Sequence, residues 1–196
     1  MKNPLTETQS DALRELCNMG SGRAAWALSR LLGRTVVVDV PRVLPLRRSA
    51  LVAELGADTQ WVGVEFQVQG EATGLLALLL PAEEARGHAG LLLGTACEAL
   101  GLLEKDALSE MGNILASSYL DTVAKVTGLW LLPSVPRLLE GTAEQVVLGL
   151  GAAEGEEPPL VLEAQWGVRG KPGLAGRLLV MPAPQTVPSL LAGLGL

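Results

Sequence analysis

Two short stretches of this chain carry the same pair of polar residues at the same spacing, and such a pair is a candidate for chemistry. Residues 11–19 recur 95 positions later as residues 106–114. Each copy holds a glutamate and, three residues on, an asparagine, neither of which a hydrophobic core requires. A carboxylate accepts hydrogen bonds, whereas a carboxamide both donates and accepts them. The residues concerned are Glu15, Asn18, Glu110 and Asn113.

A helix would place each glutamate beside its asparagine, because residues three apart share one face. At about 100° per residue, the Glu–Asn pairs fall on a polar stripe that we expect to face solvent. One turn further on stands a small residue, Gly22 or Ser117, which lets another molecule approach the helix closely. The opposite stripe of the first helix is expected to be buried and consists of Leu13, Leu16, Gly20, Ala24, Ala27, Leu28 and Leu31.

The two long helices are bounded by recognisable signals. Thr6 and Gln9 form a capping-box pattern before the first helix, which is predicted to end near residue 32 with Gly33 as its C-cap. The second is predicted over residues 104–126 and stops at Gly128. Alternating or β-branched segments predict strands over 35–40, 61–68, 73–80, 129–132, 135–139, 144–150, 160–168 and 174–181. Short helices are predicted over 83–100, where Gly87, Gly90 and Gly94 are candidate breaks, and over 187–192. A loop or irregular strand is predicted over 41–57, and an acidic loop over 151–159.

Each half therefore reads as a helix, then strands, then a short helix. We predict one domain over residues 1–196, built from repeats of about 6–100 and 101–196. The fold class is α/β (α+β), with pseudo-two-fold symmetry and one mainly antiparallel sheet flanked by the two long helices.

Composition excludes several classes of function. A net charge of −6 argues against a nucleic-acid partner, which requires clustered basic residues. No apolar run approaches the length of a membrane span, and the N-terminus lacks the apolar stretch of a signal peptide. Two cysteines, Cys17 and Cys97, suit a reduced cytoplasm, and Cys17 is expected in the core.

Metal and nucleotide sites also lack their usual residues. The single histidine, His88, rules out a multi-histidine zinc site and is expected to face solvent on a helix. Residues 20–22 are glycine-rich but lack the Gly-Lys-Ser/Thr ending of a phosphate loop. The acidic loop over 151–159 lacks the ligand spacing of a calcium loop.

The duplicated motif resembles that of the CheC/CheX/FliY family of chemotaxis phosphatases. Residues 11–22 and 106–117 both fit the family pattern of an acidic residue, asparagine three residues later and a small residue four beyond it, the second copy with Ser117 in the small position. Two copies in one chain resemble the CheC branch, since CheX-like members carry one site and FliY-like members carry added segments.

The resemblance implies a specific activity. Family members hydrolyse the aspartyl phosphate of a CheY-like response regulator in two-component signalling. Glu15 and Glu110 would engage the regulator's active-site lysine, and Asn18 and Asn113 would position the attacking water. No cofactor or metal is expected in this chain, because the regulator holds the Mg²⁺. The resemblance also offers CheD, a receptor deamidase, as a partner.

Two other functions are considered beside the phosphatase. One is a non-catalytic CheC-like adaptor that binds CheD or a response regulator without turnover. The other is an unrelated duplicated α/β domain that associates through its helices. An intact Glu–Asn pair in both copies favours the enzyme.

Overall fold

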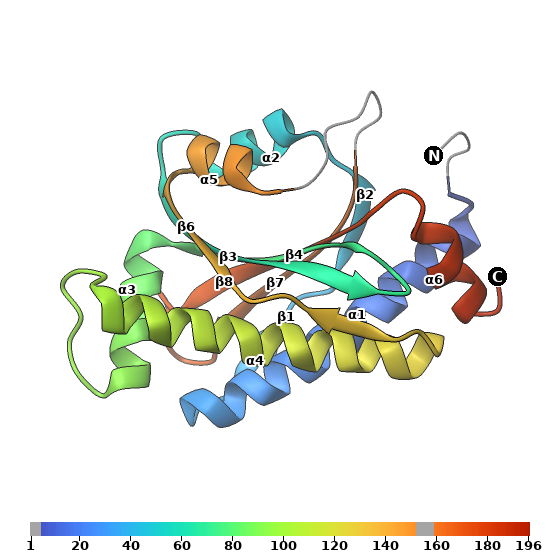
Figure 1. The fold of residues 1–196 in the computed structure, drawn as a ribbon. Coiled ribbons are helices and arrows are strands. Elements are labelled where there is room, and N and C mark those ends of the chain that lie inside the picture. The colour runs from blue at the N-terminus through green and yellow to red at the C-terminus, as the bar shows by residue number, and fades with distance from the viewer. Residues whose placement is uncertain (1–4, 152–158) are drawn as a thin grey trace.

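The computed structural model describes residues 5–151 and 159–196, and the chain folds as two halves with the same order of elements (Figure 1). The first half comprises α1 (Glu7–Leu32), β1 (Val36–Val38), β2 (Arg42–Pro45), α2 (Arg48–Leu55), β3 (Gln60–Gly70), β4 (Gly74–Pro81) and α3 (Ala82–Leu93). The second comprises α4 (Leu102–Thr127), β5 (Leu131–Pro133), β6 (Arg137–Thr142), α5 (Ala143–Gly149), β7 (Leu160–Val168), β8 (Ala175–Pro182) and α6 (Val187–Gly193).

The strands form one antiparallel sheet with the order β1-β7-β8-β4-β3-β5. β2 also pairs with β7, and β6 pairs with β3. The short strands of each half therefore pair with a long strand of the other half. The equivalent strands of the two halves are β1 and β5, β7 and β3, and β8 and β4. Exchanging each strand for its equivalent gives the same strand order read from the opposite edge of the sheet, as a two-fold axis requires. The predicted fold class, with its pseudo-two-fold symmetry and antiparallel sheet, is confirmed.

Helices cover both faces of the sheet (Figure 1). α1 and α4 pack against each other on one face, above a core that includes Leu13, Leu115, Tyr119 and Phe66. α2 and α5 cover the other face over a smaller apolar cluster. The two long helices are therefore held between the sheet and solvent, so each has one buried and one open side.

Local signals mark the start of α1 and the ends of both long helices. The Thr6 hydroxyl accepts a hydrogen bond from the Gln9 backbone at 3.2 Å, and the Gln9 side chain accepts from the Thr6 backbone at 3.1 Å. This capping box satisfies donors that the first turn leaves free. α1 and α4 end at Gly33 and Gly128, whose φ angles of 61° and 75° are left-handed and favour glycine. These boundaries were predicted correctly.

A row of residues across the sheet marks the pseudo-two-fold axis. The axis passes between Ala77 and Leu179, which are partners in the central β4–β8 pair. On either side lies a fully buried glutamate, and beyond it an arginine from the other half. Across the sheet the row reads Arg42, Glu163, Leu179, Ala77, Glu65 and Arg137.

The buried glutamates are held by different numbers of cations. Glu163 pairs with Arg42 and with Arg177, whose guanidinium lies 2.9 Å away. Glu65 pairs with Arg137 and accepts a 2.6 Å hydrogen bond from the neutral side chain of Gln67. Hydrogen bonds to Glu54 and Glu163 raise the pKa of Arg42 above its usual value. Each half thus buries one glutamate, but among the described residues two arginines pair with Glu163 and one pairs with Glu65.

Several predicted elements are wrong. Residues 144–150 were predicted to be a strand but belong to α5, whose N-cap Thr142 and Gln145 form a second capping box. Residues 41–57, predicted as a loop or irregular strand, contain β2 and α2. The helix predicted over 83–100 ends at Leu93, where Gly94 adopts a left-handed conformation. Most of the acidic loop predicted over 151–159 lies outside the described residues.

His88 was predicted to face solvent, but its side chain is fully buried. It lies on α3 with its ring centre 5.0 Å from that of Trp166 on β7. Burial lowers the pKa of His88 to about 4, against a smaller opposing effect of the Ala175 backbone. The prediction failed because a sequence pattern does not show that α3 packs this face of its helix against β7.

Among the described residues, no helix is both long and apolar enough to cross a lipid bilayer. No three or more His, Cys, Asp or Glu side chains in that part of the chain gather as a metal site would require.

Candidate functional site on the two long helices

The structure places both Glu–Asn pairs on the two long helices, as predicted, and each pair lies in the N-terminal half of its helix. Glu15 and Asn18 are exposed on α1, and the Asn18 amide donates to the Glu15 carboxylate at 3.5 Å. Glu110 is exposed on α4, but Asn113 is half-buried. No hydrogen bond links Glu110 to Asn113 within the described residues, nor joins one pair to the other. The chain thus carries two separate candidate sites that differ in exposure.

The buried side of α1 explains why the polar pair faces outward. Leu13, Leu16 and Leu28 are buried against the sheet, as predicted. Two members of the expected apolar stripe differ, since Ala27 is half-buried and Leu31 is exposed near the end of the helix. Because the helix is anchored through its leucine side, the opposite side, with Glu15 and Asn18, remains open to a partner.

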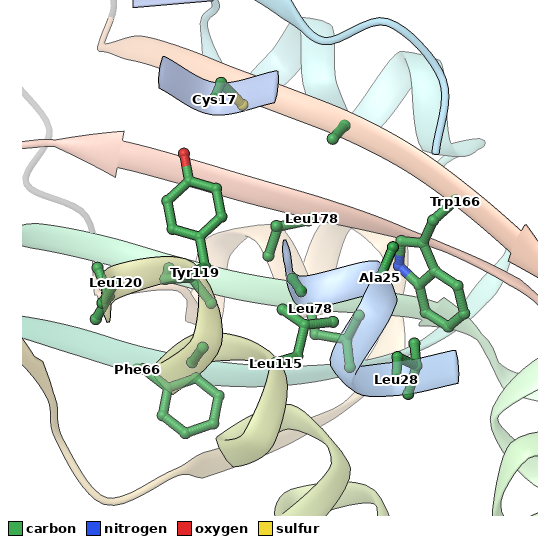
Figure 2. Packing of buried hydrophobic residues seen from close by; sticks show 14 of the residues in the cluster. Cys17, Ala25, Leu28, Phe66, Leu78, Leu115, Tyr119, Leu120, Trp166 and Leu178 are labelled. Carbon is green, nitrogen blue, oxygen red and sulfur yellow. The ribbon is translucent and has the colours of Figure 1, made fainter. Parts of the chain in front are cut away.

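Cys17, the residue before Asn18 on α1, is buried in the hydrophobic core, as predicted (Figure 2). Burial raises the pKa of the Cys17 thiol, while side-chain hydrogen bonds with Tyr119 and Ser21 act in the opposite direction. Burial also raises the pKa of the Tyr119 hydroxyl well above its usual value, and Cys17 raises it further. Both groups are therefore neutral near pH 7 and serve as support for the helix rather than as acids or bases.

Two glycines on α1, Gly20 and Gly22, lie two residues apart and serve different purposes. A Cβ atom at Gly20 would lie 2.6 Å from the Tyr119 ring of α4, so glycine is needed there for the two helices to pack. A Cβ atom at Gly22 would meet nothing within 4 Å. Packing inside the chain therefore does not explain Gly22, which leaves open space next to Asn18. The corresponding position on α4 is the half-buried Ser117.

The exposed face of α1 continues past Gly22 into residues that the sequence analysis missed. Trp26 is 47% exposed, and the guanidinium carbons of Arg23 and Arg30 lie 4.1 Å and 5.1 Å from the centre of its ring. Eleven residues separate Trp26 from Glu15, which is close to three helical turns and places both on one face. Continuing the helical wheel beyond the repeated motif would have found this group.

Comparison with known proteins agrees with the geometry. The CheC-like family model matches residues 9–44 and 103–140, which contain both Glu–Asn pairs and occupy equivalent parts of the two halves. The chain is 37% identical over 142 residues to the CheY-P phosphatase CheC of Bacillus subtilis (strain 168), covering 69% of this chain and 68% of that protein.

Two further proteins extend the comparison. CheC1 of Halobacterium salinarum is 30% identical over 137 residues, covering 68% of this chain and 70% of its own length. The crystal structure of Thermotoga maritima FliY shares the fold, with a TM-score of 0.78, 18% identity and 98% coverage of both chains. The chain belongs to the CheC-like family, which confirms the resemblance found in its sequence.

Proposed function

We propose that this protein is a phosphatase that hydrolyses the aspartyl phosphate of a CheY-like response regulator. The observation that supports the proposal is the duplicated Glu–Asn pair on the two long helices of a CheC-like fold, which is exposed on α1 and partly exposed on α4, where Asn113 is half-buried. A relative with 37% identity bears the name CheY-P phosphatase CheC. A docked regulator would meet one pair at a time.

The chemistry requires little from the enzyme beyond positioning. An acyl phosphate is already activated, so hydrolysis needs a water molecule held in line with the phosphorus more than it needs a strong base. A neutral carboxamide can donate to and accept from that water. In our proposal Asn18 and Asn113 orient the water, and the regulator itself contributes Mg²⁺, so this chain supplies no metal or cofactor.

The glutamates have a separate task in the proposal. Glu15 and Glu110 pair with the active-site lysine of the regulator, which orients the partner on the helix. A carboxylate facing an ammonium group stabilises the bound complex before any bond breaks, so it contributes mainly to docking. Gly22 and Ser117 are the small positions that let the partner approach beside the asparagine.

We also propose a cytoplasmic location, in chemotaxis or motility signalling. Both cysteines are free, and Cys17 is buried without a disulfide partner, which suits a reducing compartment.

The test is release of inorganic phosphate from a phosphorylated regulator. CheY of Bacillus subtilis, phosphorylated with acetyl phosphate in the presence of Mg²⁺ and freed of excess reagent, is mixed with catalytic amounts of this protein. We expect phosphate release to exceed the regulator's own rate in proportion to the protein added. An unchanged rate would contradict the phosphatase.

The same mixture also tests the adaptor alternative. If calorimetry detects binding of the phosphorylated regulator, or of CheD, while phosphate release stays at the regulator's own rate, the chain is an adaptor. Turnover at substoichiometric protein excludes a role limited to holding the partner.

A further inference from the structure

The strip of α1 beyond the first Glu–Asn pair combines exposed apolar surface with positive charge. Met19 and Trp26 are 44% and 47% exposed, although both are large hydrophobic residues. Arg23 stacks on the Trp26 ring at 4.1 Å, and Arg30 approaches the same ring at 5.1 Å. Tryptophan and arginine are the residue types that most often dominate binding at protein interfaces. We call Met19, Arg23, Trp26 and Arg30 the tryptophan strip.

The arginines of this strip form no ion pair with the part of the chain that the structure describes. Among the described residues, neither Arg23 nor Arg30 has a carboxylate oxygen within 4.0 Å. Residues 19–32 contain these two arginines and no acidic residue, in a chain with a net charge of −6. An acidic protein therefore presents one unpaired positive surface next to its candidate site. This arrangement fits an acidic partner surface.

The second long helix has no equivalent strip. The positions 95 residues after Arg23, Trp26 and Arg30 are occupied by Ser118, Asp121 and Lys125. The aromatic residue is thus replaced by a carboxylate, and one of the two cations by a hydroxyl. Because the two helices share their fold and their Glu–Asn pair, the strip is a difference between otherwise equivalent sites.

We propose that the tryptophan strip is a docking surface for the acidic surface of the response regulator around its phosphoryl group, so that the first site binds the regulator more tightly than the second. This inference rests on the proposed function. A regulator that holds Mg²⁺ beside its phosphoryl group needs carboxylates there, because Mg²⁺ takes oxygen ligands.

The strip lies within reach of a partner seated on Asn18. At about 1.5 Å per residue, Arg23 stands ~7.5 Å and Trp26 ~12 Å along the helix from Asn18. A protein interface of ordinary size extends well beyond these distances. Gly22 has no side chain to separate the partner from the helix between the two regions. The partner can therefore contact the pair and the strip together.

The experiment isolates the first site and measures KM and kcat separately. In a background with Glu110→Ala and Asn113→Ala, phosphate release from phosphorylated Bacillus subtilis CheY is followed for Trp26→Ala and for the double variant Arg23→Ala with Arg30→Ala. We expect each to raise KM about tenfold and to leave kcat unchanged. The double arginine variant should also lose most of the dependence of KM on salt concentration.

Matched control variants are available on α4. Ser118→Ala and Lys125→Ala, introduced in the same background, occupy the equivalent positions and should leave KM unchanged. The reverse transfer uses the opposite background, with Glu15→Ala and Asn18→Ala. There, Ser118→Arg with Asp121→Trp should lower the KM of the second site by about threefold or more. Thermal unfolding followed by circular dichroism verifies that each variant is folded.

The outcomes separate this inference from the proposed function. Absence of phosphate release by the wild-type protein would overturn the proposed function and this inference with it. Wild-type release with an unchanged KM in the Trp26 and arginine variants would overturn only the docking surface. Trp26-dependent binding to phosphatidylglycerol vesicles, or Trp26-dependent dimers in sedimentation, combined with an unchanged KM, would assign the strip to a membrane or to a second copy and overturn the inference.

Discussion

The first and second Glu–Asn sites sit at equivalent places on equivalent helices, yet their surroundings differ. Glu15 and Asn18 are exposed and hydrogen-bonded at 3.5 Å, next to the empty space at Gly22. On α4, Asn113 is half-buried, and Ser117 stands in the small position. The spacing of the pair is fixed by the helix, whereas its surroundings have diverged. Chemistry and docking can therefore be varied separately on this fold.

The buried glutamates extend the comparison to stability, and they give the largest expected effect. Arg137→Ala removes the only cation paired with Glu65 among the described residues, whereas Arg42→Ala leaves Arg177 beside Glu163. Removing one partner of a buried ion pair leaves an uncompensated charge, which costs about 3–5 kcal/mol. Because the Arg137 side chain is half-exposed and only Glu65 is buried, urea unfolding should show a loss of about 3 kcal/mol for Arg137→Ala, at the lower end of this range, and clearly less for Arg42→Ala. Equal losses would contradict the unequal charge balance of the two halves.

The helices α3 and α6, which end the two halves, also differ: α3 buries a histidine, His88, and α6 contains none. The pKa of His88 is lowered from 6.5 to about 4 by burial. The unfolded chain therefore binds more protons than the folded chain between these values, so stability falls as pH falls from 6.5 to 4. The free energy of unfolding should drop by about 3 kcal/mol over this window. His88→Phe should remove most of that pH dependence, and a variant that retains it would refute the assignment.

Substitution of the two glutamates tests whether they contribute to binding of the regulator. Glu15→Ala with Glu110→Ala should weaken binding of the phosphorylated regulator about tenfold, because each removes a carboxylate that we propose pairs with the regulator's lysine. Calorimetry measures the affinity, and phosphate release measures turnover. Arg14→Ala, on α1 but paired with Asp11, is the control and should bind normally. Wild-type affinity in the double glutamate variant would show that Glu15 and Glu110 do not contribute to binding of the regulator.

Substitution of Gly22 is expected to give the smallest change, and it should affect stability and phosphate release in opposite directions. Gly22→Ala should raise the free energy of unfolding by up to about 1 kcal/mol, because glycine is a poor helix former and the site is open. The same variant should lower phosphate release by the first site, measured with the second site disabled by Asn113→Ala. Gly20→Ala should instead destabilise the protein, because its Cβ would clash with Tyr119. Unfolding by urea measures both, and a destabilised Gly22→Ala would contradict the open geometry.

Local signals predicted the elements that position the site. The capping box at Thr6, the glycines after each long helix and the apolar periodicity are all properties of neighbouring residues. The same reasoning placed Glu15, Asn18 and Glu110 on exposed faces. A local signal also marks α5, because Thr142 and Gln145 repeat the capping-box pattern. The neighbouring β-branched residues Val146 and Val147 favour a strand, and this explains the wrong prediction.

Tertiary contacts account for what the sequence could not predict. Glu65 and Arg137 are 72 residues apart and Arg42 and Glu163 are 121 apart, so only the sheet register brings them together. The burial of His88 depends on β7, which belongs to the other half. The partial burial of Asn113 likewise depends on how α4 is packed, because its sequence motif matches that of the exposed Asn18.

The central claim is that Asn18 and Asn113 position the water that hydrolyses the phosphoryl group. Its most direct test is single-turnover phosphate release from phosphorylated Bacillus subtilis CheY, with the double variant Asn18→Ala and Asn113→Ala at saturating concentration. Saturation removes any effect on binding, so only the chemical step is measured. We expect a rate about a hundredfold below that of the wild type, with regulator affinity retained. A wild-type rate at saturation would show that neither asparagine takes part in hydrolysis.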